Sequence, residues 1–200
     1  MNDYSIRMRK WLEADRPFSA TEISDAGIPR HILTQLCNRG VISRVEHGVY
    51  LPADASVTEH ISLQIAALRA PHCVVCLFSA LRFHDFTTQI SPDVWIAIEQ
   101  HSRIPAMGRL TPRVVMLSEV PFRYGVEEHD VGGVKIRVYS AAKTVADCFK
   151  FRNKIGMEVA LEALRDGMRR KLFPVSDLMA AAKACRVSKI ITPYVESIFS

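Results

Sequence analysis

The segment from residue 18 to residue 51 constrains the fold of this 200-residue chain more than any other, because its helix-start and helix-stop signals follow one another closely. Ser19 and Glu22 have the spacing of a capping box, in which each side chain accepts the backbone N–H of the other residue. A helix is therefore predicted to begin at Ala20. Gly27 favours the left-handed conformation that ends such a helix after about two turns.

A second helix is predicted from Pro29 to Arg39, because proline is tolerated in a first helical turn and Gly40 ends the segment. At about 100° per residue, its side chains fall on two opposite faces. The apolar face, which is suited to packing on a core, carries Ile32, Leu33, Leu36 and Cys37. The opposite face carries the candidate base readers, polar side chains whose size is suited to reaching base edges: His31, Thr34, Gln35 and Asn38.

Residues 41–45 and 49–51 are predicted to form the two strands of a hairpin. The turn between them has three residues and ends in Gly48, which suits a left-handed position. Helix, turn, helix and hairpin wing, in this order, form a winged helix-turn-helix domain, whose second helix enters the major groove of operator DNA. Contacts with the DNA backbone or the neighbouring minor groove are expected from Arg30, Arg39, Arg44 and His47.

The chain is expected to contain two domains with an α+β fold overall. A short linker begins at Pro52 and places the boundary between residues 1–52, the winged helix-turn-helix domain, and residues 53–200. Apolar runs such as 94–98 have the length of core strands, and helical patterns dominate after residue 140. The second domain is therefore predicted to combine a mixed or antiparallel sheet with C-terminal helices.

Punctuating residues predict where elements of the second domain begin. Gly132 and Gly133 form a two-residue hairpin turn that tolerates positive φ at both positions. Ser140 is placed to cap the helix that follows this hairpin. Thr192 followed by Pro193 predicts the start of the last helix.

The formal net charge of +5 favours an acidic partner. Residues 143–189 hold eleven Lys or Arg against five Asp or Glu, so the surplus lies in the C-terminal helices. It is interpreted either as a patch for DNA phosphates or an acidic protein surface, or as an ordinary solvated surface. The candidate patch consists of Arg152, Lys154, Arg165, Arg169, Arg170 and Lys171.

Catalytic motifs are sparse. Ser79, His84 and Asp85 are the residue types of a hydrolytic triad. Their spacing on one short helix, however, prevents the chain of hydrogen bonds from nucleophile to base to carboxylate that a triad needs. Lys143 and Asp147, four residues apart, are predicted to lie on a solvated helix face. The chain is therefore not expected to be an enzyme, and no cofactor is expected.

The five cysteines do not have the pattern of a disulfide framework, which favours reduced thiols and a cytoplasmic location. Cys73 and Cys76, with His72 beside them, contain the residue types of a metal or redox site. Two valines between the cysteines instead favour a buried strand, and the chain has no second CxxC motif, so no metal is expected. No apolar run approaches the about 18 residues that a membrane span needs.

Residues 18–51, with the run LCNRGVISRVEHGVYLP, resemble the N-terminal domain of AbiEi-type antitoxins from type IV toxin-antitoxin systems of abortive infection, a form of phage defence. The resemblance extends to FSALRFHDFTTQISPDVWIAI (78–98) and VYSAAKTVADCFKFRNKIGMEVALEALR (138–165). It implies a repressor of its own two-gene operon. It also implies a C-terminal domain that opposes a nucleotidyltransferase-like toxin encoded by the adjacent gene.

Three other interpretations remain open. The winged helix could dock on a protein rather than on DNA, because an exposed polar face is also found on any surface helix. The chain could be a stand-alone transcription regulator whose second domain senses a small molecule or a metal. The third, an enzyme acting on nucleic acid, is disfavoured by the missing acid–base residues.

Overall fold

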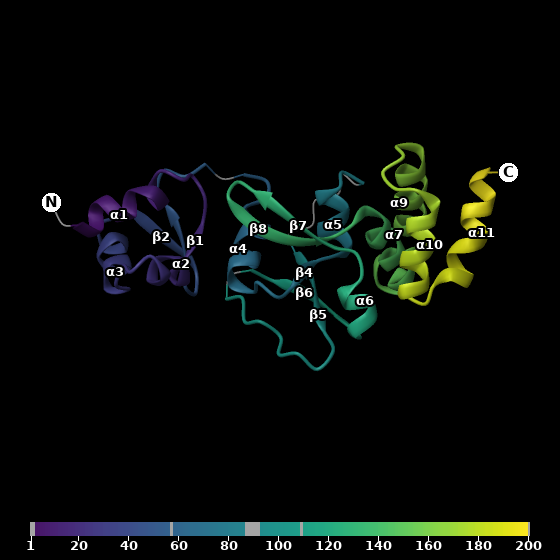
Figure 1. Ribbon diagram of the computed structural model, residues 1–200, viewed down its shortest axis with the longest axis horizontal. Helices are drawn as coiled ribbons and strands as arrows, with labels where there is room; N and C mark the ends of the chain where they lie inside the picture. Colours follow the sequence, from purple (N-terminus) through teal and green to yellow (C-terminus); the bar gives the residue numbers. More distant parts are fainter. Residues whose placement is uncertain (1–2, 57, 87–92, 109, 200) are drawn as a thin grey trace. The chain divides into compact units, whose positions relative to one another are not determined.

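The computed structural model describes residues 3–56, 58–86, 93–108 and 110–199 (Figure 1). The chain forms two compact units. The first unit comprises Met1–His72, Pro105–Thr111 and His129–Ile136. The second comprises Cys73–Ile104, Pro112–Glu128 and Arg137–Ser200. Two segments from far along the chain thus belong to the first unit. The domain boundary predicted after residue 52 stays a prediction.

The first unit has the order of elements that a winged helix-turn-helix requires. Its helices are α1 (Asp3–Leu12), α2 (Ala20–Asp25), α3 (His31–Asn38) and α4 (Ile61–Arg69). Its antiparallel sheet, in the order β1-β3-β2, consists of β1 (Phe18–Ser19), β2 (Ile42–Glu46) and β3 (Val49–Pro52). The core holds Met8, Trp11, Phe18, Ile23, Ile28, Ile32, Leu33 and Ile42.

The second sheet is mixed, which is one of the two arrangements that the sequence predicted. Its order is β6-β5-β4-β8-β7, in which β4 is antiparallel to β5 while β5 with β6 and β4 with β8 are parallel pairs. The strands are β4 (Val74–Val75), β5 (Val94–Glu99), β6 (Pro112–Leu117), β7 (Val126–Val131) and β8 (Val134–Tyr139). Together with the C-terminal helices, this sheet confirms the α+β fold.

Helix α7 is the centre of the second unit, because helices pack on it from several sides (Figure 1). Every residue from Ala142 to Phe149 is buried. The helices of this unit are α5 (Leu77–Phe83), α6 (Glu119–Arg123), α7 (Ala141–Lys150), α8 (Arg152–Ile155), α9 (Met157–Arg169), α10 (Val175–Ala184) and α11 (Ser188–Phe199). Those in contact with α7 include α5, α9, α10 and α11.

Helix α11 begins earlier than predicted. Its first turn forms at Ser188, where the N–H groups of Ile190 and Ile191 donate to the carbonyl of Val187. Pro193 therefore lies inside the helix rather than at its start. Proline lacks an N–H, which removes one helical hydrogen bond, and the Thr192 hydroxyl donates to the Ser188 carbonyl at 2.9 Å in this turn.

None of the helices in the described part of the chain has both the length and the apolar character that crossing a bilayer requires.

Candidate nucleic-acid interface

The capping box that begins α2 is formed as predicted. The Ser19 hydroxyl accepts the N–H of Glu22 at 3.1 Å, and the Glu22 carboxylate accepts the N–H of Ser19 at 2.7 Å. Arg16 also donates to the Glu22 carboxylate at 2.9 Å. Because these bonds use N–H groups that have no partner within a helix, they determine where α2 begins.

The turn between α2 and α3 depends on Gly27, whose φ of +73° lies in the left-handed region that glycine adopts without strain. The chain then reverses, and the N–H of Ile28 donates to the carbonyl of Ile23 at 3.1 Å. Both isoleucines are buried, which fixes α2 against the core. Helix α3 starts at His31, two residues after the predicted Pro29, which lies in the preceding turn.

Helix α3 has the two predicted faces. Ile32 and Leu33 are buried in the core of the first unit, and Leu36 and Cys37 are half-buried against it. The opposite face exposes all four candidate base-reading side chains: His31, Thr34, Gln35 and Asn38. Their contact with DNA bases stays a prediction.

Arginines flank the exposed face of α3 at both ends. Arg30 precedes the helix and Arg39 ends it, and both side chains are exposed. The Arg30 guanidinium donates to the Ser24 hydroxyl at 3.2 Å. Charged groups at these positions are suited to phosphate contacts on either side of a groove.

The wing, which consists of β2, β3 and their turn, differs from the prediction in its register. Glu46 pairs with Val49, which leaves His47 and Gly48 as a two-residue turn. The pairing shifts between Arg44 and Glu46, so the extra residue is accommodated within β2 as an irregularity of the ladder. The prediction of a three-residue turn was therefore wrong.

Two candidate DNA-contacting residues meet on the wing. Nη2 of Arg44 lies 2.7 Å from Nδ1 of His47, and both side chains are exposed. Glu46, between them in sequence, is 4% exposed. The wing therefore presents its basic groups outward and its carboxylate inward.

Several of the C-terminal basic residues already bind other groups of the chain. Arg169 and Arg170 both bind the carboxylate of Asp166, at 2.5 Å and 2.9 Å, and these bonds hold the pKa of that carboxyl below its ordinary value against the opposing effect of burial. Arg152 donates to the carbonyl of Phe149 at 2.9 Å, whereas Lys154, Arg165 and Lys171 are exposed.

A groove of about 650 Å³ runs beside α9 and has mixed charge. Its lining combines four carboxylates with three arginines: Asp85, Glu158, Glu162 and Asp166 with Arg165, Arg169 and Arg170. Apolar contributions come from Phe86 and Leu161. Ligand pockets are lined predominantly by apolar side chains, so this groove is not typical of one.

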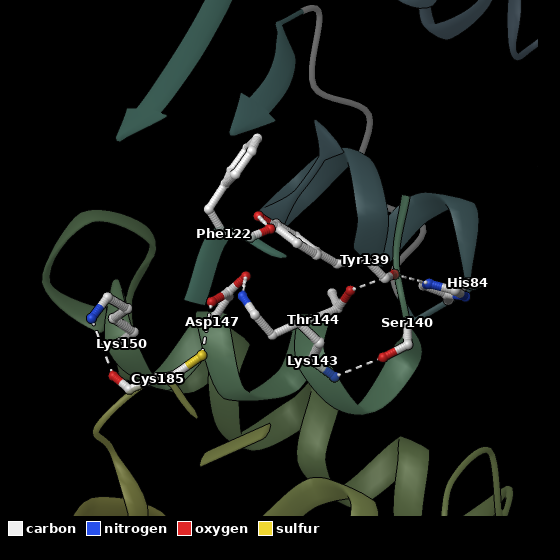
Figure 2. A network of polar contacts seen from close by, with 9 residues as sticks. All are labelled: His84, Phe122, Tyr139, Ser140, Lys143, Thr144, Asp147, Lys150 and Cys185. Atoms are coloured by element: carbon white, nitrogen blue, oxygen red, sulfur yellow. Dashed lines mark hydrogen bonds and ion pairs between the residues drawn. The ribbon is translucent and has the colours of Figure 1, made fainter. Parts of the chain in front are cut away.

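Lys143 and Asp147 do not lie on a solvated face, which corrects the prediction. Their side chains are 0% and 1% exposed, with Nζ 2.5 Å from the carboxylate (Figure 2). The ammonium also lies 3.9 Å from the centre of the Tyr139 ring, and Cys185 donates its S–H to Asp147 at 3.3 Å. Gly125 allows the close approach, since a Cβ there would lie 2.8 Å from Cβ of Lys143.

The burial of Lys143 and Asp147 could have been predicted from the residues around them, although their opposite charges suggested an exposed pair. The residues around the pair in α7 are small or apolar on every side of the helix, as in a helix buried all round. These are Ala142, Val145, Ala146, Cys148 and Phe149. The i,i+4 spacing of opposite charges indicates only that two residues are neighbours on a helix, not that water reaches them.

The residues of the rejected triad have separate structural roles. The Ser79 hydroxyl accepts the N–H of Trp95 at 2.9 Å, whereas Nε2 of His84 lies 2.7 Å from the carbonyl of Tyr139 (Figure 2). Asp85 follows α5 with a positive φ of 57° and is exposed.

The cysteine pair lies in an environment that disfavours thiolate chemistry. Burial raises the pKa of the Cys73 thiol to about 11 and that of Cys76 well above its ordinary value. Because the thiolate is the metal ligand and nucleophile, such thiols are poorly reactive at neutral pH. Over the ranges that the structure describes, no group of three or more His, Cys, Asp or Glu is placed to hold a metal ion.

The arrangement of α1, α2, α3 and the wing defines the first unit as a winged helix-turn-helix. Residues 7–53, from within α1 to the residue after β3, match the model of a family described as a transcriptional regulator, AbiEi antitoxin. This is the family that the sequence motifs resemble, and the match applies to the N-terminal segment. The comparison with curated proteins returned no match.

Proposed function

We propose that this protein is a DNA-binding antitoxin that represses its own toxin-antitoxin operon. The observation that carries this proposal is the division of α3, which anchors Ile32 and Leu33 in the core and exposes a row of hydrogen-bonding side chains. The match of residues 7–53 to a family of transcriptional regulators supports the same conclusion.

In this proposal α3 enters the major groove, where the amides of Gln35 and Asn38 read base edges, together with Thr34 and His31. Arg30 and Arg39 bind phosphates at the two ends of the helix. The paired Arg44 and His47 bring the wing onto the backbone or into the neighbouring minor groove.

The antitoxin role is assigned to residues 53–200, and the protein is proposed to act in the cytoplasm. The support is the resemblance of residues 78–98 and 138–165 to the antitoxin family, which implies a nucleotidyltransferase-like toxin encoded by the adjacent gene. Three exposed members of the basic set, Lys154, Arg165 and Lys171, are the proposed contacts for an acidic surface or for DNA. Arg169 and Arg170 are also exposed, but both already bind Asp166.

The DNA claim is tested by a gel-shift on the region upstream of the operon. Wild type is expected to bind it in preference to random duplex. Gln35→Ala or Asn38→Ala should reduce that preference by about 1 to 3 kcal/mol, because each removes a hydrogen-bonding contact to a base. Arg39→Ala should instead weaken binding to all sequences alike and reduce the salt slope by about 1.

The matched control is Gln100→Ala, which removes an exposed amide outside the first unit and should leave binding unchanged. Unchanged binding by the Gln35 and Asn38 variants would place α3 outside the groove. Wild type that does not prefer its own upstream region would contradict autorepression and favour the protein-docking interpretation of the wing and α3.

A further inference from the structure

A glutamate lies in the middle of the wing that is proposed to face DNA. Phosphates repel carboxylates, so an exposed glutamate between Arg44 and His47 would weaken binding. The side chain of Glu46 is instead turned inward and is 4% exposed. Burying a carboxylate is costly unless it is hydrogen-bonded, so its partners determine whether this conformation persists.

Both carboxylate oxygens of Glu46 accept hydrogen bonds from a segment that is distant in sequence. The N–H of Gly108 donates to Oε2 at 2.9 Å, and the N–H of Leu110 donates to Oε1 at 3.0 Å. The N–H of His47 also donates to Oε2, at 3.2 Å. Charge-assisted bonds of this kind are about twice as strong as neutral ones, so they offset much of the cost of burial.

Gly108 and Leu110 lie in Pro105–Thr111, a segment that belongs to the first compact unit. In the sequence, Gly108 follows Glu46 by 62 residues. Met107, in the same segment, is buried. At Gly108 a Cβ would lie 3.3 Å from Oε2 of Glu46, so glycine lets the backbone approach the carboxylate closely.

We infer that Glu46 is a positioning residue, which holds the wing in its DNA-binding conformation by binding the backbone N–H groups of Gly108 and Leu110. The operator-binding surface is then completed by a segment from the second half of the chain. This inference rests on the proposed DNA binding. It goes beyond it, because no base or phosphate contact is assigned to Glu46 itself.

The test is the sign of the effect of Glu46→Gln on operator affinity in the full chain. Removal of a negative charge beside DNA strengthens binding if only charge matters. A positioning role predicts the opposite, about tenfold weaker binding, because the amide presents an N–H₂ to a backbone donor. Glu46→Asp keeps the charge but is one methylene shorter, so it should weaken binding as well.

A double-mutant cycle with Arg44→Ala separates positioning from general stability. If Glu46 acts through the wing, Arg44→Ala should weaken binding about tenfold in wild type and less than about threefold in Glu46→Gln, because coupled residues are not additive. Hydrogen exchange without DNA should be faster in β2, β3 and at Leu110 in the variant, and unchanged in α7.

The outcomes separate this inference from the proposed function. Wild type that does not bind the operator overturns both. Operator binding by wild type with additive losses in the cycle, or with stronger binding by Glu46→Gln, overturns the positioning role alone. Glu13→Gln, which removes an exposed carboxylate from the same unit, is the control for the charge change and should not reproduce the loss.

Discussion

The ion pair of Lys143 and Asp147 places two ionisable side chains in the buried core of the second unit. Burial raises the pKa of Asp147 above its ordinary value of 3.8, and the attraction of Lys143 opposes this shift without cancelling it. The attraction of Lys143 therefore does not return the pKa of the Asp147 carboxyl to its ordinary value. Such pairs are weak contributors to stability when intact and strongly destabilising when one partner is removed.

Asp147→Ala is accordingly expected to lower the free energy of unfolding by about 3 to 5 kcal/mol, because it leaves the Lys143 ammonium buried without a carboxylate. The double variant Lys143→Met with Asp147→Leu should recover most of this loss. Denaturant unfolding of Asp147→Ala, of the single variants Lys143→Met and Asp147→Leu, and of the double variant measures both effects. Losses that simply add in the double variant would contradict the coupling.

The raised pKa of Asp147 also sets a direction for the pH dependence of that stability. The folded state binds the proton more tightly than the unfolded state, so the contribution of this group falls as pH rises from about 3.8 through the raised pKa. Asp147→Asn removes this titrating group. When denaturant unfolding of both proteins is measured over a series of pH values, the free energy of unfolding should fall with rising pH less in the variant than in wild type.

At the scale of elements, α2 is determined by local chemistry. Its start and the turn after it depend on bonds between Ser19 and Glu22 and on the left-handed Gly27, all within a few residues. Interactions of such short range can be predicted from sequence, and the start of α2 and the turn after it were both predicted. The start of α11 was not, because proline is favourable in a first turn yet is accommodated within the helix here at Pro193.

Ser19→Ala should destabilise the first unit by about 1 kcal/mol, because the N–H of Glu22 loses its acceptor at the start of α2. Hydrogen exchange should become faster in the first turn of α2, and the thermal midpoint should fall. Thr21→Ala, at an exposed position of the same helix, is the control and should have a smaller effect. Equal effects of the two substitutions would show that the cap contributes nothing specific.

At the scale of the whole molecule, the two units do not coincide with two consecutive stretches of chain. Pro105–Thr111 and His129–Ile136 belong to the first unit, where the Gln64 amide donates to the carbonyl of Val131 at 2.9 Å. A fragment cut at residue 52 would lose the Glu46 bonds. The two proposed roles are therefore better separated by substitutions in the full chain than by truncation.

The full chain with both Gln35→Ala and Asn38→Ala is expected to lose operator specificity and still to protect cells that express the adjacent gene. The physical reason is that both side chains are exposed on α3, so their removal leaves the core of either unit intact. Co-expression growth assays measure protection, and a reporter fused to the upstream region measures repression. Loss of both activities together would contradict the division of roles.

The sequence by itself determined the winged helix-turn-helix, because caps, turns and amphipathic faces depend on interactions between residues about four positions apart or fewer. The same local reasoning predicted which residues form the candidate base-reading face of α3. Only the tertiary structure decided the surroundings of Glu46 and Asp147, whose partners include Gly108 and Cys185, 62 and 38 residues further along the chain. Burial of a charge depends on what the fold places around it, and local spacing does not contain that information.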